Sequence, residues 1–326
     1  MSNMKYARIP HVSKPVSRIL YGTASDSFLA GEDENAALDA MLSLGVNAID
    51  TARQYGRSEN SIGRWLSSRG CRDQVVLLSK CGHHSEDGTR RVNPKEMQKD
   101  LAESLSSLCT DYIDIYILHR DDPDVPVDAI VETFNDMHAA GKIGAFGGSN
   151  WSAGRIEAAN EYAYSHNLIP FEVSSPNFGL AEPICDMWGG GSLSIAGKSN
   201  EAERKWHQKT RIATVAHSSL GRGMFSGKLK SSEYDTASRI LDSFAMKGYH
   251  TPENFERLRR CEILAEAKHA SVPQIAMSWI FHQDLNLFAV VSTSKASRMQ
   301  ENIDAMNLSL TEQESRYLDL KTDTPE

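Results

Sequence analysis

The sequence of 326 residues has no long apolar run, few cysteines and no excess of basic residues. No stretch approaches the roughly 20 apolar residues that a membrane-spanning helix needs, so we expect no membrane contact. The five cysteines form no Cys-x-x-Cys pair, which disfavours a disulfide framework and a zinc site, and we expect no bound metal. Because the first residues also lack the apolar core of a signal peptide, we expect a cytoplasmic protein.

The charge balance is acidic, with a net charge of −8. Without a basic tract, this balance argues against nucleic acid as a partner. Hydrophobic residues make up 40% of the chain, which is ordinary for a globular protein. The length fits one large domain or two medium ones, since α/β barrels commonly occupy about 250 residues. The oligomeric state does not follow from the sequence.

Short apolar segments alternate with segments of helical periodicity along the chain. The strands are expected at 17–21, 46–50, 75–80, 112–118, 143–148, 171–174, 212–216 and 287–291. This alternation, without a break in composition, predicts a single (β/α)₈ TIM barrel domain over residues 1–326, with an N-terminal hairpin strand at 5–12 closing one end. The alternative is an open doubly wound sheet, but no Gly-x-Gly-x-x-Gly follows the first strand.

Two stretches interrupt this rhythm and predict extended loops at the C-terminal face of the barrel. Residues 186–209 contain three consecutive glycines and a polar run, and are too long for an ordinary connection. We interpret them as an insertion with one helix at about 200–208, acting either as a lid or as a surface excursion. Residues 221–248 form the second long loop. Ser58 is expected to cap the helix that follows the second strand.

Four polar residues lie at or just beyond the ends of three successive expected strands. They are Asp50, Tyr55, Lys80 and His119. Reducing a carbonyl requires a hydride on carbon and a proton on oxygen. A tyrosine can give the proton if a nearby ammonium, here that of Lys80, lowers its pKa from about 10. A neutral His119 can donate a hydrogen bond to the carbonyl oxygen, whereas Asp50 has the alternative role of an ordinary ion-pair partner.

The segments around these residues resemble the aldo-keto reductase superfamily. The matching strings are IDTARQYG, LLSK, YIDIYILHR and GKIGAFGGSN, and the resemblance covers essentially the whole chain apart from residues 186–209. It implies a TIM barrel that reduces carbonyl compounds with NADP(H). It also implies that Tyr55 is the proton donor and that Asp50, Lys80 and His119 assist it.

The resemblance also predicts the cofactor contacts. A Ser-Asn pair binds the nicotinamide amide, a glycine-containing loop surrounds the pyrophosphate, and R-x-x-E-N meets the 2′-phosphate and the adenine. An arginine suits that phosphate because its planar fork binds two oxygens, which favours NADP over NAD. The predicted contacts are Ser149, Asn150, Ser175, His217, Ser218, Leu220, Gly221, Ser292, Thr293, Ser294, Arg298, Glu301 and Asn302.

Two of these positions depart from the family pattern. Ser175 stands where the family usually has glutamine, and Asn177 is a candidate to replace the lost amide. His217 stands where the family often has a larger aromatic ring against the nicotinamide.

Polar and aromatic residues on the loops are the candidate contacts for a small-molecule carbonyl substrate. They are Tyr21, Arg53, His83, Arg120, Trp151 and Trp188. The charges around Arg120 favour a hydroxylated substrate such as a sugar or cyclitol, with a merely solvated rim as the alternative. We thus expect an NADP-dependent reductase of an aldehyde or ketone. The alternatives are a polyol or alcohol dehydrogenase working oxidatively, and a cofactor-sensing regulatory subunit on the same fold.

Overall fold

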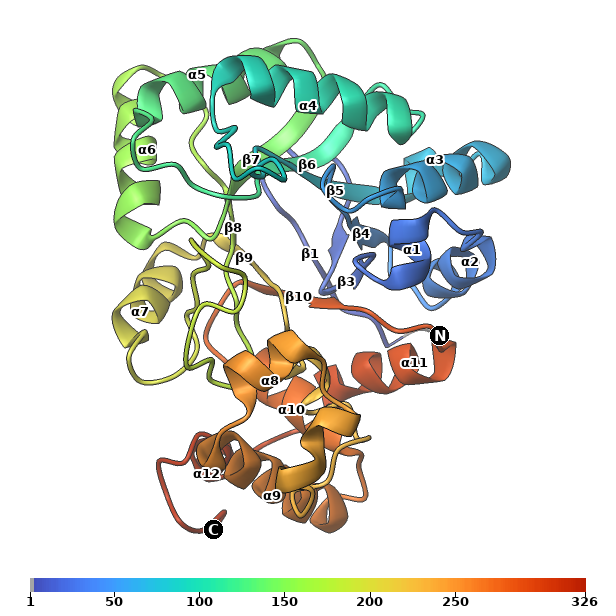
Figure 1. The fold of residues 1–326 in the computed structure, drawn as a ribbon, viewed down its shortest axis with the longest axis vertical. Helices are drawn as coiled ribbons and strands as arrows, with labels where there is room; N and C mark the ends of the chain where they lie inside the picture. The colour runs from blue at the N-terminus through green and yellow to red at the C-terminus, as the bar shows by residue number, and fades with distance from the viewer. Residues whose placement is uncertain (1–2) are drawn as a thin grey trace.

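Eight parallel strands close into a barrel in the computed structural model, which describes residues 3–326 (Figure 1). Around the barrel they follow the order β10-β3-β4-β5-β6-β7-β8-β9. Their bounds are β3 Ile19–Gly22, β4 Ala48–Asp50, β5 Val76–Cys81, β6 Ile113–Leu118, β7 Ile143–Ser149, β8 Val173–Ser175, β9 Ala213–Ala216 and β10 Leu287–Val291. Each expected strand overlaps one of these, so the predicted TIM barrel is confirmed. The strands read as continuous apolar runs because the barrel interior covers one face and the helices cover the other.

Helices surround the barrel, and one or more follow each strand (Figure 1). Their bounds are α1 Asp26–Ala30, α2 Asn35–Ser43, α3 Ser58–Arg69, α4 Pro94–Ser107, α5 Val127–Ala139, α6 Ala153–Ser165, α7 Glu201–Thr210, α8 Ser243–Tyr249, α9 Pro252–Ala267, α10 Val272–Phe281, α11 Ala296–Asp304 and α12 Glu312–Leu318. The short helix α1 was not predicted, because five residues are too few to show a periodicity. Within the described part of the chain, no helix has the length and apolar character needed to cross a bilayer.

A two-stranded hairpin closes the N-terminal end of the barrel, as predicted. Strand β1 (Tyr6–Ala7) pairs antiparallel with β2 (Val16–Ser17). Between them, Ile9 and Val12 are buried against inward-facing barrel side chains such as Phe288. This apolar plug leaves the other end of the barrel, where the strands terminate, for the loops that carry function.

The cap of α3 differs from the prediction. Ser58 is the first helical residue, and its hydroxyl donates to Thr23 Oγ1 at 2.8 Å and lies 3.1 Å from Thr51 Oγ1. The capping position is taken by Arg57, whose side chain makes no capping hydrogen bond. Ser58 is fully buried, so its hydroxyl bonds to these two threonines instead of to the helix end.

The two long loops also differ from the prediction. Helix α7 occupies the regular ring position between β8 and β9 and packs beside α6, so it is not part of an insertion. The irregular segment is therefore confined to residues 176–200. Residues 221–248 are not one continuous loop, because they contain two 3₁₀ turns and most of α8, whose N-terminus is capped by Asp242. The helix predicted at about 200–208 is thus confirmed as α7, and only its assignment to an insertion is wrong.

Candidate active site

The four predicted catalytic side chains meet at the C-terminal mouth of the barrel. Lys80 Nζ lies 2.6 Å from Asp50 Oδ1 and donates to the Thr51 carbonyl oxygen at 2.9 Å. The same Nζ is 4.9 Å from the centre of the Tyr55 ring. The Tyr55 and His119 rings are 5.4 Å apart, edge to face at 78°. The parallel strands β4, β5 and β6 produce this convergence because they end side by side.

The loop that holds Tyr55 is fixed by the unpredicted helix α1. The backbone N–H of Arg57 donates to the Leu29 carbonyl oxygen at 3.0 Å. Gly56 lies between Tyr55 and Arg57 with φ +51°, and a Cβ there would meet that oxygen at 2.5 Å. Only glycine allows both this backbone conformation and this approach. Helix α1 therefore positions Tyr55 through the backbone of the residues that follow it.

Burial and charge decide which groups carry protons. Burial by itself would lower the pKa of Lys80, but the Asp50 carboxylate and Tyr55 outweigh it, so that pKa is raised and Lys80 is a cation. Burial also raises the pKa of Tyr55, and Lys80 offsets this only in part. The expected lowering is therefore wrong for the protein alone, and Tyr55 is a protonated phenol at neutral pH. Burial, with Lys80 nearby, holds the pKa of His119 well below 6.5, so its imidazole is neutral.

Two predicted substrate contacts lie beside this group. The His83 ring is 4.8 Å from the His119 ring, and its Nδ1 is 3.0 Å from the His84 carbonyl oxygen. Arg120 directly follows His119, and its positive charge acts on Tyr55, His119 and His83. The mouth of the barrel thus combines a phenol, neutral imidazoles and a guanidinium.

The other predicted substrate contacts are engaged elsewhere. Arg53 pairs with Glu103 at 2.6 Å and with Asp100 at 3.4 Å, both on α4. The Tyr21 hydroxyl donates to the Thr293 carbonyl oxygen at 3.2 Å. Trp151 is 0% exposed, and its indole N–H donates to the Arg120 carbonyl oxygen at 3.4 Å. Trp151 therefore supports the mouth of the barrel from below rather than lining it.

Trp188 lies in the irregular segment rather than beside His119. Its ring stacks on Phe244, with centroids 4.8 Å apart, and the Arg222 guanidinium lies 4.6 Å above it. Arg222 is paired with Asp242. Sequence reasoning missed Arg222. Its φ of +50°, unusual for any residue other than glycine, marks a strained loop of the kind found at binding sites.

The residues predicted to hold the nicotinamide gather next to His119. The Ser149 hydroxyl donates to the Ser175 carbonyl oxygen at 2.8 Å, and Asn150 Nδ2 donates to the His119 carbonyl oxygen at 3.3 Å. Asn150 Oδ1 lies 3.4 Å from His217 Nε2. Burial lowers the pKa of His217 to about 3, so this ring is also neutral. The Leu193 N–H also donates to Asn150 Oδ1 at 3.1 Å, so Asn150 would have to exchange one of these bonds to hold a nicotinamide amide.

Asn177 does not replace the amide that the family usually has at Ser175. Its Nδ2 donates to the Tyr249 hydroxyl at 2.8 Å, and its Oδ1 accepts from the Ser194 hydroxyl at 3.1 Å. Both ends of the side chain are therefore committed within the protein. Ser175 itself contributes its backbone carbonyl to the site.

The residues predicted to hold the phosphates and the adenine lie around β9 and α11. Ser218, Leu220 and Gly221 follow β9, and Ser292, Thr293 and Ser294 lead into α11. Arg298 is partly exposed and has no ion pair among residues 3–326. Glu301 lines a cavity of about 370 Å³ and accepts from the Ser271 hydroxyl at 3.3 Å.

An orphaned atom tests whether these residues suit the cofactor. Asn302 is buried, and its Oδ1 has no hydrogen-bond partner in the part of the chain that is described. A buried acceptor without a donor is costly, and the amino group of an adenine would supply that donor. Together with the unpaired Arg298, this acceptor fits an adenine nucleotide.

Sequence comparison adds to this geometry. The sequence model of the Aldo/keto reductase family matches residues 18–323. This chain belongs to that family. Membership makes the protein an oxidoreductase of the class that reduces carbonyl groups with NAD(P)H.

Three relatives illustrate the range of similarity of this aldo/keto reductase. Aldo-keto reductase YhdN of Bacillus subtilis is 29% identical, over 86% of this chain and 82% of that one. Norsolorinic acid reductase B of Aspergillus parasiticus is 28% identical, over 94% of this chain and 80% of its own. Probable aryl-alcohol dehydrogenase AAD4 of Saccharomyces cerevisiae is 25% identical, over 86% and 85%.

Proposed function

We propose that this aldo/keto reductase uses NADP(H) to reduce an aldehyde or ketone reversibly to an alcohol, with Tyr55 as the proton donor. The observation that carries the proposal is the buried pair of Lys80 and Asp50, 2.6 Å apart, against the ring of Tyr55. A buried ion pair is weak support for stability alone. Beside a phenol in a barrel mouth, it is the arrangement that controls proton transfer.

The roles of the protein groups follow from their protonation states. NADPH, when bound, supplies the hydride. Tyr55, protonated at neutral pH, gives its proton to the carbonyl oxygen, and the ammonium of Lys80 stabilises the phenolate that remains. The neutral His119 donates a hydrogen bond that orients the same oxygen. Asp50 keeps Lys80 charged and in place.

Arg298 supports the choice of NADP over NAD. It stands at the start of α11 without an ion pair among the described residues, so its guanidinium is available to a 2′-phosphate. Ser292, Thr293 and Ser294 supply hydroxyls nearby. Glu301 and the unpartnered Asn302 would hold the adenine.

The proposal also covers the cellular location of the protein and the direction of the reaction. The five cysteines are all free, which favours the cytoplasm. Relatives are named for a reductase and for a probable aryl-alcohol dehydrogenase, so the oxidation of an alcohol is the second candidate function. Turnover should therefore be measured in both directions, with NADPH and NADH, against aryl aldehydes, ketoses, keto-cyclitols and the matching alcohols. Cofactor binding without turnover of any of them would favour a cofactor-sensing subunit instead.

A further inference from the structure

Arg120 is a buried cation without a counterion. Its side chain directly follows His119 at the barrel mouth, and the residue is only 8% exposed. The guanidinium makes one side-chain hydrogen bond, from Nη1 to the Ser192 hydroxyl at 3.3 Å. Its Nε is buried and has no partner, and no carboxylate of residues 3–326 forms an ion pair with it. Burying an unpaired charge is costly, so this arrangement needs an explanation.

The two acids that follow Arg120 in the sequence do not neutralise it. Asp121 pairs with Arg155 at 3.2 Å, and Asp122 pairs with Arg90 at 2.6 Å. The run of charges that looked like a polar rim in the sequence is therefore divided in the structure. Asp121 and Asp122 are neutralised by other arginines, and only Arg120 of the three has no ion pair.

The groups that face Arg120 are neutral or already occupied. Burial lowers the pKa values of His83, His119 and His217, so all three rings are uncharged near neutral pH. The acid whose charge acts on Arg120 is Asp186.

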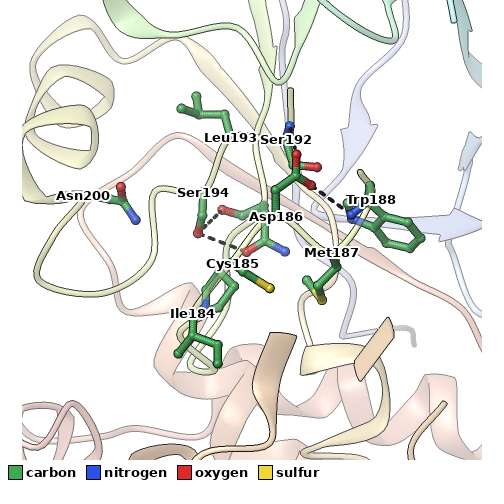
Figure 2. Close-up of a pocket in the computed structure, with 11 residues that line it drawn as sticks. Ile184, Cys185, Asp186, Met187, Trp188, Ser192, Leu193, Ser194 and Asn200 are labelled. Atoms are coloured by element: carbon green, nitrogen blue, oxygen red, sulfur yellow. Dashed lines mark hydrogen bonds between the residues drawn. The ribbon is translucent and has the colours of Figure 1, made fainter. Parts of the chain in front are cut away.

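Asp186 is committed to its own loop. Its carboxylate accepts from the backbone N–H groups of Trp188 at 2.9 Å, Gly190 at 2.9 Å and Ser192 at 3.1 Å. Figure 2 shows the bonds to Trp188 and Ser192, with Asp186 in the wall of a cavity of about 230 Å³. Ser192, the hydrogen-bond partner of Arg120, lines the same cavity. An anion beside Ser192 would therefore reach the guanidinium.

We propose that Arg120 binds a carboxylate of the substrate, so that the enzyme prefers carbonyl compounds bearing a carboxylate over neutral ones of the same shape. A guanidinium binds a carboxylate through two parallel hydrogen bonds, which would satisfy the orphaned Nε. The charge acts on Tyr55, so the carboxylate lies on the same side as the group that protonates the carbonyl oxygen. This inference rests on the proposed carbonyl reduction and names the substrate class for it.

The test compares two aldehydes that differ in charge, 4-carboxybenzaldehyde and 4-methylbenzaldehyde. Their ratio of kcat/KM with NADPH is measured in the native protein, in Arg120→Met and in Arg120→Lys. Arg120→Met should lower the ratio of charged to neutral substrate by at least about tenfold, mainly through KM, because a charge-assisted pair is lost. Arg120→Lys should restore part of the preference, since it keeps the charge and loses the fork. Because the same two aldehydes are used with each protein, the difference in their intrinsic reactivity cancels when the ratios are compared between proteins.

Arg69→Met is the matched control, because it also removes a guanidinium, but one that is exposed and already paired with Asp39 at the end of α3. The ratio should stay within about twofold of the native value there. If Arg120→Met lowers kcat/KM for both aldehydes equally, Arg120 only holds the loop at Ser192 and the inference is wrong. An unchanged ratio in both Arg120 variants would overturn it as well.

Binding separates this inference from the proposed function. Terephthalate has no aldehyde or ketone group and cannot be reduced. In calorimetry with NADP⁺ it should bind the native protein, and it should bind Arg120→Met about tenfold more weakly. If neither aldehyde turns over but this binding difference is found, the proposed reduction fails and the anion site stands. If terephthalate binds both proteins equally and turnover is normal, the anion site is disproved and the proposed reduction stands.

Discussion

The Lys80 ammonium donates a 2.6 Å hydrogen bond to Asp50 inside the barrel mouth, where the two side chains are only 4% and 7% exposed. In water this pair would be screened, whereas here its charges act strongly on the neighbouring Tyr55. The ammonium favours the phenolate, and the burial that surrounds both groups favours the phenol. The protonation state of Tyr55 therefore depends on the balance between these two effects.

Removing the Tyr55 hydroxyl should stop proton transfer and leave cofactor binding intact. Tyr55→Phe is expected to lower kcat for aldehyde reduction by at least about 100-fold, the scale of general acid catalysis. The dissociation constant of NADPH, measured by fluorescence titration, should barely change because the hydroxyl serves the chemical step. Near-native turnover in this variant would remove Tyr55 from the donor role.

The pH dependence should differ between the two directions of reaction. Reduction needs the protonated phenol, and the pKa of Tyr55 is raised above its usual value of 10. Its kcat should therefore be flat through neutral pH and fall only under strongly alkaline conditions. Oxidation needs the phenolate, so the kcat for oxidation should rise with pH from neutral to strongly alkaline conditions. Because the pKa of His119 lies well below 6.5, neither profile should show a transition near that pH. A step near pH 6.5 in both would contradict the assignment of a neutral His119.

Removing the ammonium should strengthen that asymmetry. Lys80→Met removes the ammonium that lowers the pKa of Tyr55 and leaves the Asp50 carboxylate, which raises it, so that pKa should rise further. The rate of alcohol oxidation at pH 9 should then fall by about tenfold for each unit of that rise. The double variant Lys80→Met with Asp50→Asn is the control, since it removes the unpaired carboxylate. A smaller loss in the double variant would confirm that the charge of Asp50 acts on Tyr55, whereas native oxidation rates in both would exclude this coupling.

Arg298 should distinguish NADPH from NADH. Arg298→Ala is expected to weaken NADPH binding by about 1–3 kcal/mol, typical of a hydrogen bond to a charged group. NADH lacks the 2′-phosphate, so its affinity should be almost unchanged. Lys295→Ala, which removes an exposed cation just before the same helix, is the matched control and should affect NADPH less. Equal weakening of both cofactors by Arg298→Ala would show that another residue binds the phosphate.

The convergence of the four candidate catalytic residues could be predicted from the sequence because it follows from topology. Asp50 and Lys80 end apolar segments and His119 directly follows one, and parallel strands bring such ends to one face. Their protonation could not be predicted in the same way. The pKa of Tyr55 depends on how much water the fold excludes, which the sequence does not state, so burial outweighed the expected effect of Lys80.

The ion-pair partners of the charged residues at the barrel mouth could not be predicted from the sequence either. Arg120, Asp121 and Asp122 are adjacent in the chain, yet the structure pairs the two acids with Arg155 and Arg90 and leaves Arg120 unpaired. The helix α7 was mistaken for part of an insertion because a glycine-rich segment precedes it. Only its packing beside α6 shows that it completes the ring.

The irregular segment at the barrel mouth is anchored at two points, one of them in the candidate active site. The backbone N–H of Leu193 donates to Asn150 Oδ1 at 3.1 Å, and Trp188 stacks on Phe244. Between these contacts, Gly189–Gly191 have φ values of +81°, +136° and +76°, with open space around each. The Asp186 carboxylate holds the Gly190 N–H at 2.9 Å, so a lid that adjusts to the substrate would move by breaking that bond.

A point substitution tests this lid better than a deletion, because removing residues 192–208 would also remove most of the ring helix α7. Trp188→Ala should raise KM or alter substrate preference and leave NADPH affinity intact, since Trp188 lines the same cavity as Ser192, the hydrogen-bond partner of Arg120. Trp206→Ala is the matched control. That tryptophan lies on α7 and donates to Glu157 on the outer ring, so its removal should leave KM unchanged. An unchanged KM and substrate profile in Trp188→Ala would show that the segment is not a lid. Loss of oligomers on gel filtration, with native kinetics, would instead assign the segment to a subunit contact.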